Sequence, residues 1–260
     1  MLGTVGKASR LLELFTSETP EWGVTEAALA LQVPRSSAHD LLDTLACTGL
    51  LRRVEGNRYR PGVKLLCLSS AALDSFAVRG AARPVMETLA RRLGATIHLA
   101  ILDQAEVVYI DKVTPAGGPR IAASGVGRRL PAHCSAVGKV LLAHQPAATM
   151  MHTLERLELR PLTERTICSV DALRFELGGT RRAGVARDRE GAVQGVCCHA
   201  APIVERGTTT AAISVSVPTD AEQRLADRYD EIVRGAAIRI SRTLTADARD
   251  HEPGGQPVAV

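Results

Sequence analysis

The feature that most constrains the fold is the stretch of residues 24–62, in which two helical runs are separated by one tight turn. The first run, residues 25–31, is interrupted at Pro34, because proline lacks an N–H and disfavours helix in the residue before it. The second run, residues 35–48, carries an apolar stripe at helical spacing and polar side chains elsewhere. Gly49 follows it, where a left-handed residue commonly ends a helix. The pattern predicts a helix-turn-helix.

Two short strand-like runs follow, residues 50–54 and 57–61, joined through Glu55-Gly56 as in a hairpin. Helix, turn, helix and two-stranded wing is the order of a winged helix-turn-helix DNA reader. Only Glu55 opposes the basic side chains of the wing, and a wing laid along a duplex needs such charges to displace counterions. These basic residues are Arg52, Arg53, Arg58, Arg60 and Lys64.

We predict that DNA is contacted by the polar side of the second helix and by the wing. The predicted residues are Arg35, Ser36, Ser37, His39, Asp40, Arg52, Arg53, Arg58 and Arg60. The alternative is a solvated hairpin with ordinary surface arginines, and the polar-faced helix directly before the wing favours DNA.

The overall composition limits the class of protein to which this chain can belong. The chain has 260 residues, 45% of them apolar and 23% charged, with a formal net charge of +4. This suits two modest globular domains and is far from the extremes of disordered chains. No run approaches the roughly 20 apolar residues of a membrane span, and Lys7, Arg10 and Glu13 interrupt any signal-peptide core. The six cysteines show no CxxC spacing, so we expect reduced thiols in a cytoplasmic protein.

Patterning predicts an α+β chain in four parts. Residues 1–62 form the winged domain, residues 63–80 a linker helix, residues 81–245 a domain of mixed strands and helices, and residues 246–260 a disordered tail. The linker carries more leucine than a free helix tolerates in water, so we expect it to pack against its copy in a homodimer. Helices are expected at residues 5–15, 84–93, 135–144, 147–157, 173–182 and 221–243, and strands at residues 96–102, 107–113, 120–123, 196–204 and 210–217.

Five stretches in order resemble one known family, the IclR-type transcriptional regulators, over roughly residues 4–245. The most specific is LPAHCSAVGKVLLA at residues 130–143; the others are residues 34–42, 58–62, 184–190 and 200–216. The resemblance implies a winged helix, a linker helix and a C-terminal effector-binding domain of GAF-like shape. It further implies dimers or dimers of dimers that bind palindromic operators on double-stranded DNA. The implied effectors are small metabolites such as carboxylates and aromatic acids.

The resemblance also implies an effector site. Carried over position by position, its residues are Leu130, Ala136, Val137, Asp188, Val196, Cys198, Ser214 and Ser216. Two departures limit the transfer. Asp40 stands where the family usually has arginine, so it repels phosphate and could accept from a cytosine amino group or pair with Arg35 or Arg53. Gly191 stands where the family usually has a second acidic residue, which leaves the charge of the site open.

The residues themselves support this site in part. Ser214 and Ser216 are two apart in an apolar strand, so both hydroxyls face one side, and Cys198 shares a face with Val196. A helix beginning near Ser135 would offer free N–H groups to a small anion. The alternative is that these are small core residues satisfied by neighbouring backbone.

The sequence also contains residue types suited to chemistries other than binding an organic effector. His133-Cys134 and Cys197-Cys198-His199 contain zinc-ligand types, but strand alternation sends Cys197 and Cys198 to opposite faces. A thiol redox switch lacks an obvious basic neighbour other than the two histidines.

An enzyme reading would use Ser135, His133 and Asp188 as a triad, but the G-x-S-x-G pattern of the nucleophile elbow is absent. We therefore predict a repressor controlled by a small metabolite, with no catalytic residue, no cofactor and no resident metal. The alternative is a DNA-binding protein whose C-terminal domain senses metal or redox state.

Overall fold

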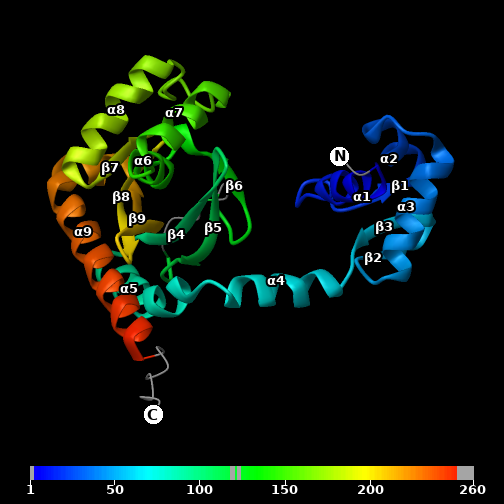
Figure 1. Ribbon diagram of the computed structural model, residues 1–260, viewed down its shortest axis with the longest axis horizontal. Coiled ribbons are helices and arrows are strands. Elements are labelled where there is room, and N and C mark those ends of the chain that lie inside the picture. Colours follow the sequence, from blue (N-terminus) through cyan, green and yellow to red (C-terminus); the bar gives the residue numbers. More distant parts are fainter. Residues whose placement is uncertain (1–2, 118–120, 122–123, 251–260) are drawn as a thin grey trace, which may run out of the picture. The chain divides into compact units, whose positions relative to one another are not determined.

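The chain divides into two units, Met1–Ser75 and Phe76–Val260. Figure 1 shows the computed structural model, which describes residues 3–117, 121 and 124–250. Each unit has its own buried apolar cluster. The two-domain α+β class predicted from the sequence is confirmed.

Residues 3–61 of unit 1 form a bundle of three helices with a three-stranded antiparallel sheet of order β1-β3-β2. Its core includes Leu11, Leu42 and Tyr59, all almost inaccessible to solvent. Its elements are α1 (Gly3–Glu13), β1 (Trp22–Gly23), α2 (Val24–Leu31), α3 (Arg35–Cys47), β2 (Leu51–Val54), the short 3-10 helix η1 (Glu55–Asn57) and β3 (Arg58–Pro61).

The predicted helix-turn-helix and wing are present. The apolar stripe of α3 is buried as expected: Ala38, Leu41, Leu42 and Leu45. Gly49 has φ +80°, the left-handed conformation expected after the helix. Trp22 lies on β1, opposite Tyr59 of β3, and its indole N–H donates to the Leu14 carbonyl at 2.8 Å.

The linker contains α4 (Lys64–Asp74), and no residue of this helix is buried. The helix stops before Phe76, whose backbone is extended (φ −90°, ψ 91°), and α5 (Ala77–Leu93) begins directly after it. We had expected this second helix to begin at Pro84. It starts earlier because Val78 and Ala82 pack into the core, which offsets the hydrogen bond that Pro84 removes.

Unit 2 is built on a six-stranded antiparallel sheet of order β6-β5-β4-β9-β8-β7. Its strands are β4 (Thr96–Asp103), β5 (Glu106–Val113), β6 (Arg129–Pro131), β7 (Ala186–Arg189), β8 (Val196–Glu205) and β9 (Thr208–Pro218). Its other elements are the 3-10 helix η2 (Ala132–Cys134) and the helices α6 (Ala136–Ala143), α7 (Ala147–Arg156), α8 (Val170–Ala183) and α9 (Thr219–Asp250).

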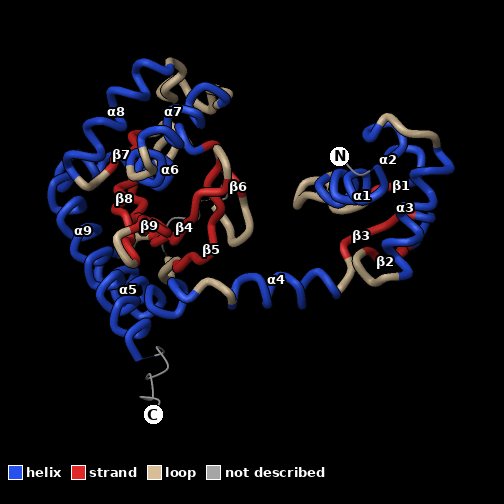
Figure 2. The backbone as a smooth tube through the Cα atoms, in the orientation of Figure 1, coloured by secondary structure: helices blue, strands red, loops and turns tan. Residues whose placement is uncertain are grey.

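Helices cover both faces of this sheet. α5 and α9 pack on one face, and α6 packs on the other with α8 behind it. Figures 1 and 2 show the strands curled between these two layers, with α9 along one side and α6, α7 and α8 together on the other. The predicted effector residues therefore lie on the face covered by α6.

Three expectations about unit 2 need correction or fall outside the structure. The short strands β6 and β7 were not predicted, because three or four residues carry too little alternation to stand out. The predicted tail is helical as far as Asp250, since no helix breaker occurs before Pro253; residues 251–260 lie outside the described residues. The expected strand at residues 120–123 also falls almost wholly outside them.

The start of α6 is held by a close backbone approach. Ser135 caps the helix, its Oγ accepting from the Gly138 N–H at 3.1 Å. A Cβ at Gly138 would overlap the carbonyl oxygen of Ala132, so only glycine fits there. This close contact explains why position 138 of the motif at residues 130–143 is glycine, and it fixes where α6 begins.

Among the described residues, no single helix is both long and apolar enough to cross a membrane. Only α4 and α5 taken together meet that test, and the chain is broken between them.

Candidate functional site

In unit 1, a hollow of about 660 Å³ lies between the start of α2, the start of α3 and the wing. It brings together five of the residues predicted to contact DNA: Arg35, Ser36, His39, Arg53 and Arg58. Ser37, Asp40, Arg52 and Arg60 do not line it, although all four are accessible on α3 or the wing. The helix and the wing thus form one polar surface, as a winged reader requires.

The charge balance of the wing differs from the one predicted. Arg58 pairs with Glu26 (2.8 Å) and with Glu21 (3.3 Å), and Arg60 also pairs with Glu21. The hydrogen bond from Arg58 lowers the pKa of Glu26, which keeps this carboxylate charged. Glu55 is therefore not the only opposing charge, because carboxylates from α2 and the preceding loop reach the wing.

The second helix also engages the wing. Arg53 pairs with Asp43 of α3, and its guanidinium carbon lies 5.7 Å from the centre of the Tyr59 ring. Over the residues that the structure describes, Asp40 forms no ion pair with Arg35 or Arg53; its Oδ1 lies 3.5 Å from Nδ1 of the adjacent His39.

Two predicted residues keep an unpaired charge. Within the part of the chain that the structure describes, Arg35 and Arg52 make no ion pair and both are exposed. They are the arginines that phosphates can reach without breaking an existing pair.

In unit 2, strand register aligns the predicted effector residues. Asp188, Cys198 and Ser216 are successive cross-strand partners on β7, β8 and β9, so their side chains share one face. Ser214 lies two residues along on the same face. This is the face covered by α6.

A chain of polar contacts runs across this face. The Cys198 Sγ lies 3.1 Å from the Ser216 Oγ, which lies 3.3 Å from His98 Nδ1. The other ring nitrogen, His98 Nε2, is 2.7 Å from the Ser124 Oγ. Burial, reinforced by the nearby Lys112, lowers the pKa of His98 to about 3, so the ring is neutral and both nitrogens serve as hydrogen-bond partners.

Asp188 is a buried carboxylate at the end of this row. Its oxygens accept from the N–H groups of Gly191 (2.9 Å) and Ala192 (3.3 Å). Burial raises its pKa to about 6, against the smaller opposing influence of Lys139. A Cβ at Gly191 would lie 2.5 Å from Asp188 Oδ1, so a larger residue at this position would have to displace the Asp188 carboxylate.

The remaining predicted residues surround this row unequally. Ala136 and Val137 are buried at the start of α6, and Leu130 on β6 packs against the same apolar cluster. Val196 is opposite Pro218 at the beginning of β8, half-buried and outside the cluster. The structure therefore gathers seven predicted residues around the α6 face and leaves Val196 at its margin.

Sequence reasoning missed several residues of this site: Thr96, His98, Tyr109 and Ser124. Thr96 is opposite Ser216 and His98 opposite Ser214, and the rings of His98 and Tyr109 lie 5.2 Å apart. The i, i+2 spacing of Thr96 and His98 was a readable signal, but only the register of β4 with β9 shows that they join the serines.

The rival chemistries find little support. Across residues 3–117, 121 and 124–250, no three His, Cys, Asp or Glu side chains are grouped to hold a metal ion. Cys197 and Cys198 face opposite sides of the sheet, as predicted, because they are consecutive on β8. Burial raises the pKa of Cys134 and of Cys198 to about 12, which suppresses thiolate chemistry. The Ser135 hydroxyl is occupied as a helix cap.

Comparison with known proteins identifies the two domains. Residues 4–55 match the IclR helix-turn-helix domain, and residues 70–242 match the domain described as bacterial transcriptional regulator IclR C-terminal. The chain is 36% identical to the HTH-type transcriptional regulator XynR of Escherichia coli over 94% of its length and 98% of that protein. It is 32% identical to the transcriptional repressor IclR of Escherichia coli, over 80% of this chain and 77% of that protein.

A solved structure extends the comparison to ligand binding. An IclR homologue from Microbacterium hydrocarbonoxydans, complexed with 4-hydroxybenzoate, aligns with a TM-score of 0.82 at 27% identity, covering 94% of this chain and 100% of that one. These relatives are regulators and not enzymes.

Asp188 gives the stability of unit 2 a defined pH dependence. Because its pKa is raised in the folded state, Asp188 adds to the free energy of unfolding at low pH. This contribution is fully present below its ordinary pKa of 3.8 and is lost as pH rises through about 6. Between pH 7 and pH 5 the wild type should gain about 1 kcal/mol of unfolding free energy relative to Asp188→Asn. The measurement is urea unfolding followed by circular dichroism, because the single tryptophan, Trp22, lies in unit 1. The exposed Asp171→Asn should keep the wild-type profile, and parallel profiles for Asp188→Asn and the wild type would contradict the assignment.

Proposed function

We propose that this chain, which belongs to the IclR family of bacterial transcriptional regulators, is a repressor that binds a palindromic operator and responds to a small metabolite. The observation that carries the proposal is the pairing, in one chain, of a polar winged-helix surface with a separate buried polar site beneath α6. Such a regulator acts where bacterial DNA is, in the cytoplasm.

The winged surface supports operator binding. Ser36 and His39 are exposed at the start of α3, where a recognition helix meets base edges. Arg35 and Arg52 supply charge for phosphates, while Arg58 and Arg60 are held by Glu21 and Glu26. We infer that Arg58 and Arg60 position the wing as much as they contact DNA.

The linker supports a homodimer. Leu66 is 72% exposed and Leu68 51% exposed on α4. Such side chains on a helix with no buried residue gain most by packing against a second copy. A dimer would present two winged domains to the two halves of a palindrome, and two dimers could associate further.

The site beneath α6 supports a small carboxylate, an aromatic acid or a related metabolite. The N–H groups at the start of α6 favour a negative group. The hydroxyls of Ser214 and Ser216 and the neutral His98 offer further hydrogen bonds next to an apolar cluster. Because Asp188 repels a second anion, the effector's acidic group would lie toward α6 and a hydroxyl toward Asp188.

Strand β7 links this site to α9. Asp188 faces α6, while its neighbour Arg187 points to the other face and binds Asp230 (2.6 Å) and Asp227 (2.6 Å) of α9. α9 packs in turn on α5, which directly follows the linker helix in the chain. We propose that effector binding shifts β7 and α9 between two arrangements, since an effector changes DNA affinity only if it prefers one of them.

Operator binding is tested by fluorescence anisotropy with the promoter region of the gene. Arg52→Ala should weaken binding to all sequences about equally and reduce the salt slope by about 0.9, one phosphate contact. Ser36→Ala should instead change sequence preference. Glu55→Gln, a loss of negative charge in the same wing, should not weaken binding. Operator binding would be contradicted if the wild type did not bind the promoter region, or if its affinity did not depend on salt concentration.

Dimer formation is tested with Leu66→Glu. A carboxylate buried between two linker helices is costly, so this variant should be monomeric by light scattering at micromolar concentration. It should also bind operator much more weakly, because the half-sites are no longer engaged together. Phe175→Glu places the same charge at an exposed apolar position of α8 in unit 2, away from the linker helix in the chain, and should remain dimeric. A monomeric wild type would refute the proposal.

The effector site is tested by calorimetric titration with a panel of small carboxylates and aromatic acids, beginning with 4-hydroxybenzoate. Ser214→Ala and Asp188→Asn should each weaken binding of the active compound about tenfold or more, because each leaves a buried partner unsatisfied. Operator affinity without the compound should stay near wild type. The matched control is Thr210→Ala, an exposed hydroxyl on the same strand. Wild-type affinity in both site variants would place the effector elsewhere.

A further inference from the structure

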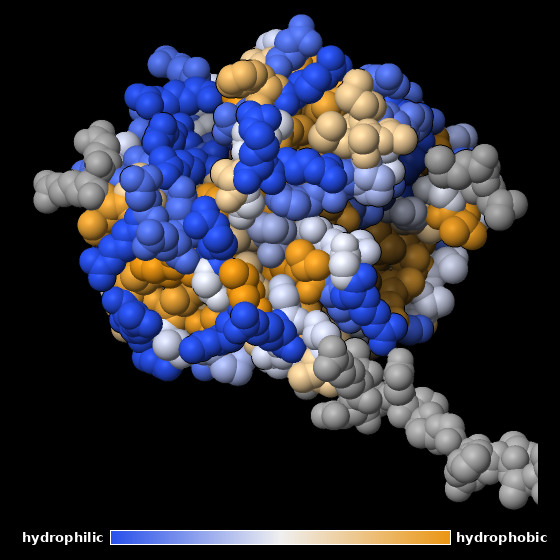
Figure 3. Space-filling model, turned by 60° about the vertical axis from the view of Figure 1, so that its left-hand side comes forward, coloured by the Kyte–Doolittle hydropathy of each residue, from blue (hydrophilic) through white to orange (hydrophobic). Residues whose placement is uncertain are grey.

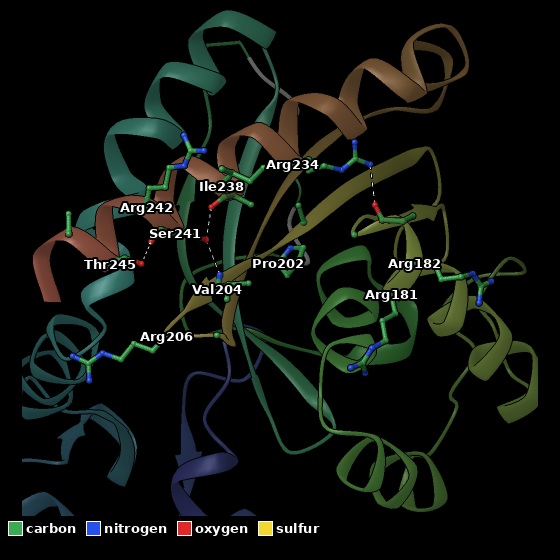
Figure 4. A pocket seen from close by; sticks show the side chains of 16 residues that line it. Arg181, Arg182, Pro202, Val204, Arg206, Arg234, Ile238, Ser241, Arg242 and Thr245 are labelled. Carbon is green, nitrogen blue, oxygen red and sulfur yellow. Dashed lines mark hydrogen bonds between the residues drawn. The ribbon is translucent and has the colours of Figure 1, made fainter. Parts of the chain in front are cut away.

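A second concave surface of unit 2 lies away from the α6 face. It is an open groove of about 760 Å³ between α9, the end of α8 and β8. Figure 4 shows Arg234, Ile238, Ser241, Arg242 and Thr245 following one another along α9, with Pro202 and Val204 of β8 beside them. Figure 3, in which this side of unit 2 comes forward, shows apolar patches framed by hydrophilic side chains.

The groove has a strong excess of positive charge. Among the residues whose side chains the structure describes, those that line it include five arginines and no aspartate or glutamate: Arg181, Arg182, Arg206, Arg234 and Arg242. They come from three different elements, with Arg181 and Arg182 toward one end and Arg206 toward the other (Figure 4).

These charges are available to a partner. Arg234 donates to the Ala183 carbonyl at 3.2 Å, and Arg181 donates to the carbonyls of Ala143 and Gln145 at 3.2 and 3.1 Å. Carbonyls orient the two guanidiniums but leave their charge in place. Arg182, Arg206 and Arg242 make no ion pair with any residue that the structure describes. Each can still take a carboxylate in a bidentate pair.

The floor of the groove is apolar and closed to strand addition. Pro202, Val204 and Ile238 lie along it, and Ile238 is 47% exposed. β7 pairs with β8 only as far as Ala200, so beyond that residue no strand of the described chain pairs with this edge of β8. Pro202 has no N–H, and the Val204 N–H already donates to the Ser241 Oγ at 2.9 Å. An added strand would therefore find few backbone partners.

We propose that this arginine-lined groove docks an acidic amphipathic helix of a partner protein. The apolar floor takes the apolar stripe of such a helix, and its flanking carboxylates meet the arginines. Arg234 and Arg242 are eight residues apart on α9, about 12 Å along the helix, so a small anion would meet only one end of the groove.

Charge and shape favour a protein over a nucleic acid here. None of the described residues that line the groove is aromatic and able to stack on a base, and an apolar floor gains nothing from phosphates. The groove lies on the α9 side of the sheet, whereas Asp188 and Ser214 face α6. The proposal thus goes beyond operator and effector binding, and its test needs neither.

The test titrates the full chain into a fluorescein-labelled 14-residue peptide with a leucine stripe flanked by glutamates, followed by anisotropy. Binding should saturate and weaken with salt, and a lysine-for-glutamate peptide should not bind. The double variant Arg206→Glu with Arg242→Glu should lose about tenfold or more in affinity. Arg239→Glu, an exposed arginine of α9 outside the groove, should change it less than about twofold. Ile238→Ser, which keeps every charge, should also weaken binding, so the test does not depend on the double variant alone. Circular dichroism checks that the double variant is folded.

Several results would overturn the proposal. The first is that the peptide shows no saturable binding. The second is that Arg239→Glu loses as much peptide affinity as the double variant. The third is that random duplex DNA displaces the peptide with the same dependence on Arg206 and Arg242. A change in oligomeric state of the double variant by sedimentation would show instead that a second copy of this chain covers the groove.

Discussion

The strict alternation of side chains along β8 and β9 is the constraint on which unit 2 depends. Cys198 and Ser216 face α6, while Cys197 and His199 face α9, because neighbouring residues of a strand point to opposite sides. A slip of one residue in the register would exchange the two sets. The polar row under α6 would then lose Ser216 and gain apolar side chains such as Val215. Fixing the register therefore fixes which groups an effector can meet.

The polar row is satisfied without a ligand, and this shapes how it can bind one. Cys198 contacts Ser216, Ser216 contacts His98, and His98 contacts Ser124. A buried polar group left without a partner costs about 1–3 kcal/mol, so an effector must replace the contacts that it breaks. This favours ligands that match the row and gives the site selectivity. Asp188 is similarly held by two backbone N–H groups, so its position is set before any ligand arrives.

Unit 1 uses charge in a different way. The pairs of Arg58 and Arg60 with Glu21 and Glu26 lie on the surface, where such pairs contribute about 0–1 kcal/mol each. Their main consequence is geometric, since they tie the wing to the start of α2 and so to α3. The wing and recognition helix then form one surface, and the arginines left unpaired, Arg35 and Arg52, lie on it.

The sequence by itself determined the order and type of most elements, because the spacing of apolar residues and the positions of Pro34 and Gly49 are local signals. It also determined that Ser214 shares a face with Ser216, since strand alternation is local. Only the tertiary structure decided which distant residues come together: Glu21 pairs with Arg60, His98 contacts Ser216, and Arg206 and Arg242 line one groove. Those meetings depend on strand order, register and helix packing, which arise from contacts between segments far apart in the chain and leave no periodic trace in either segment alone.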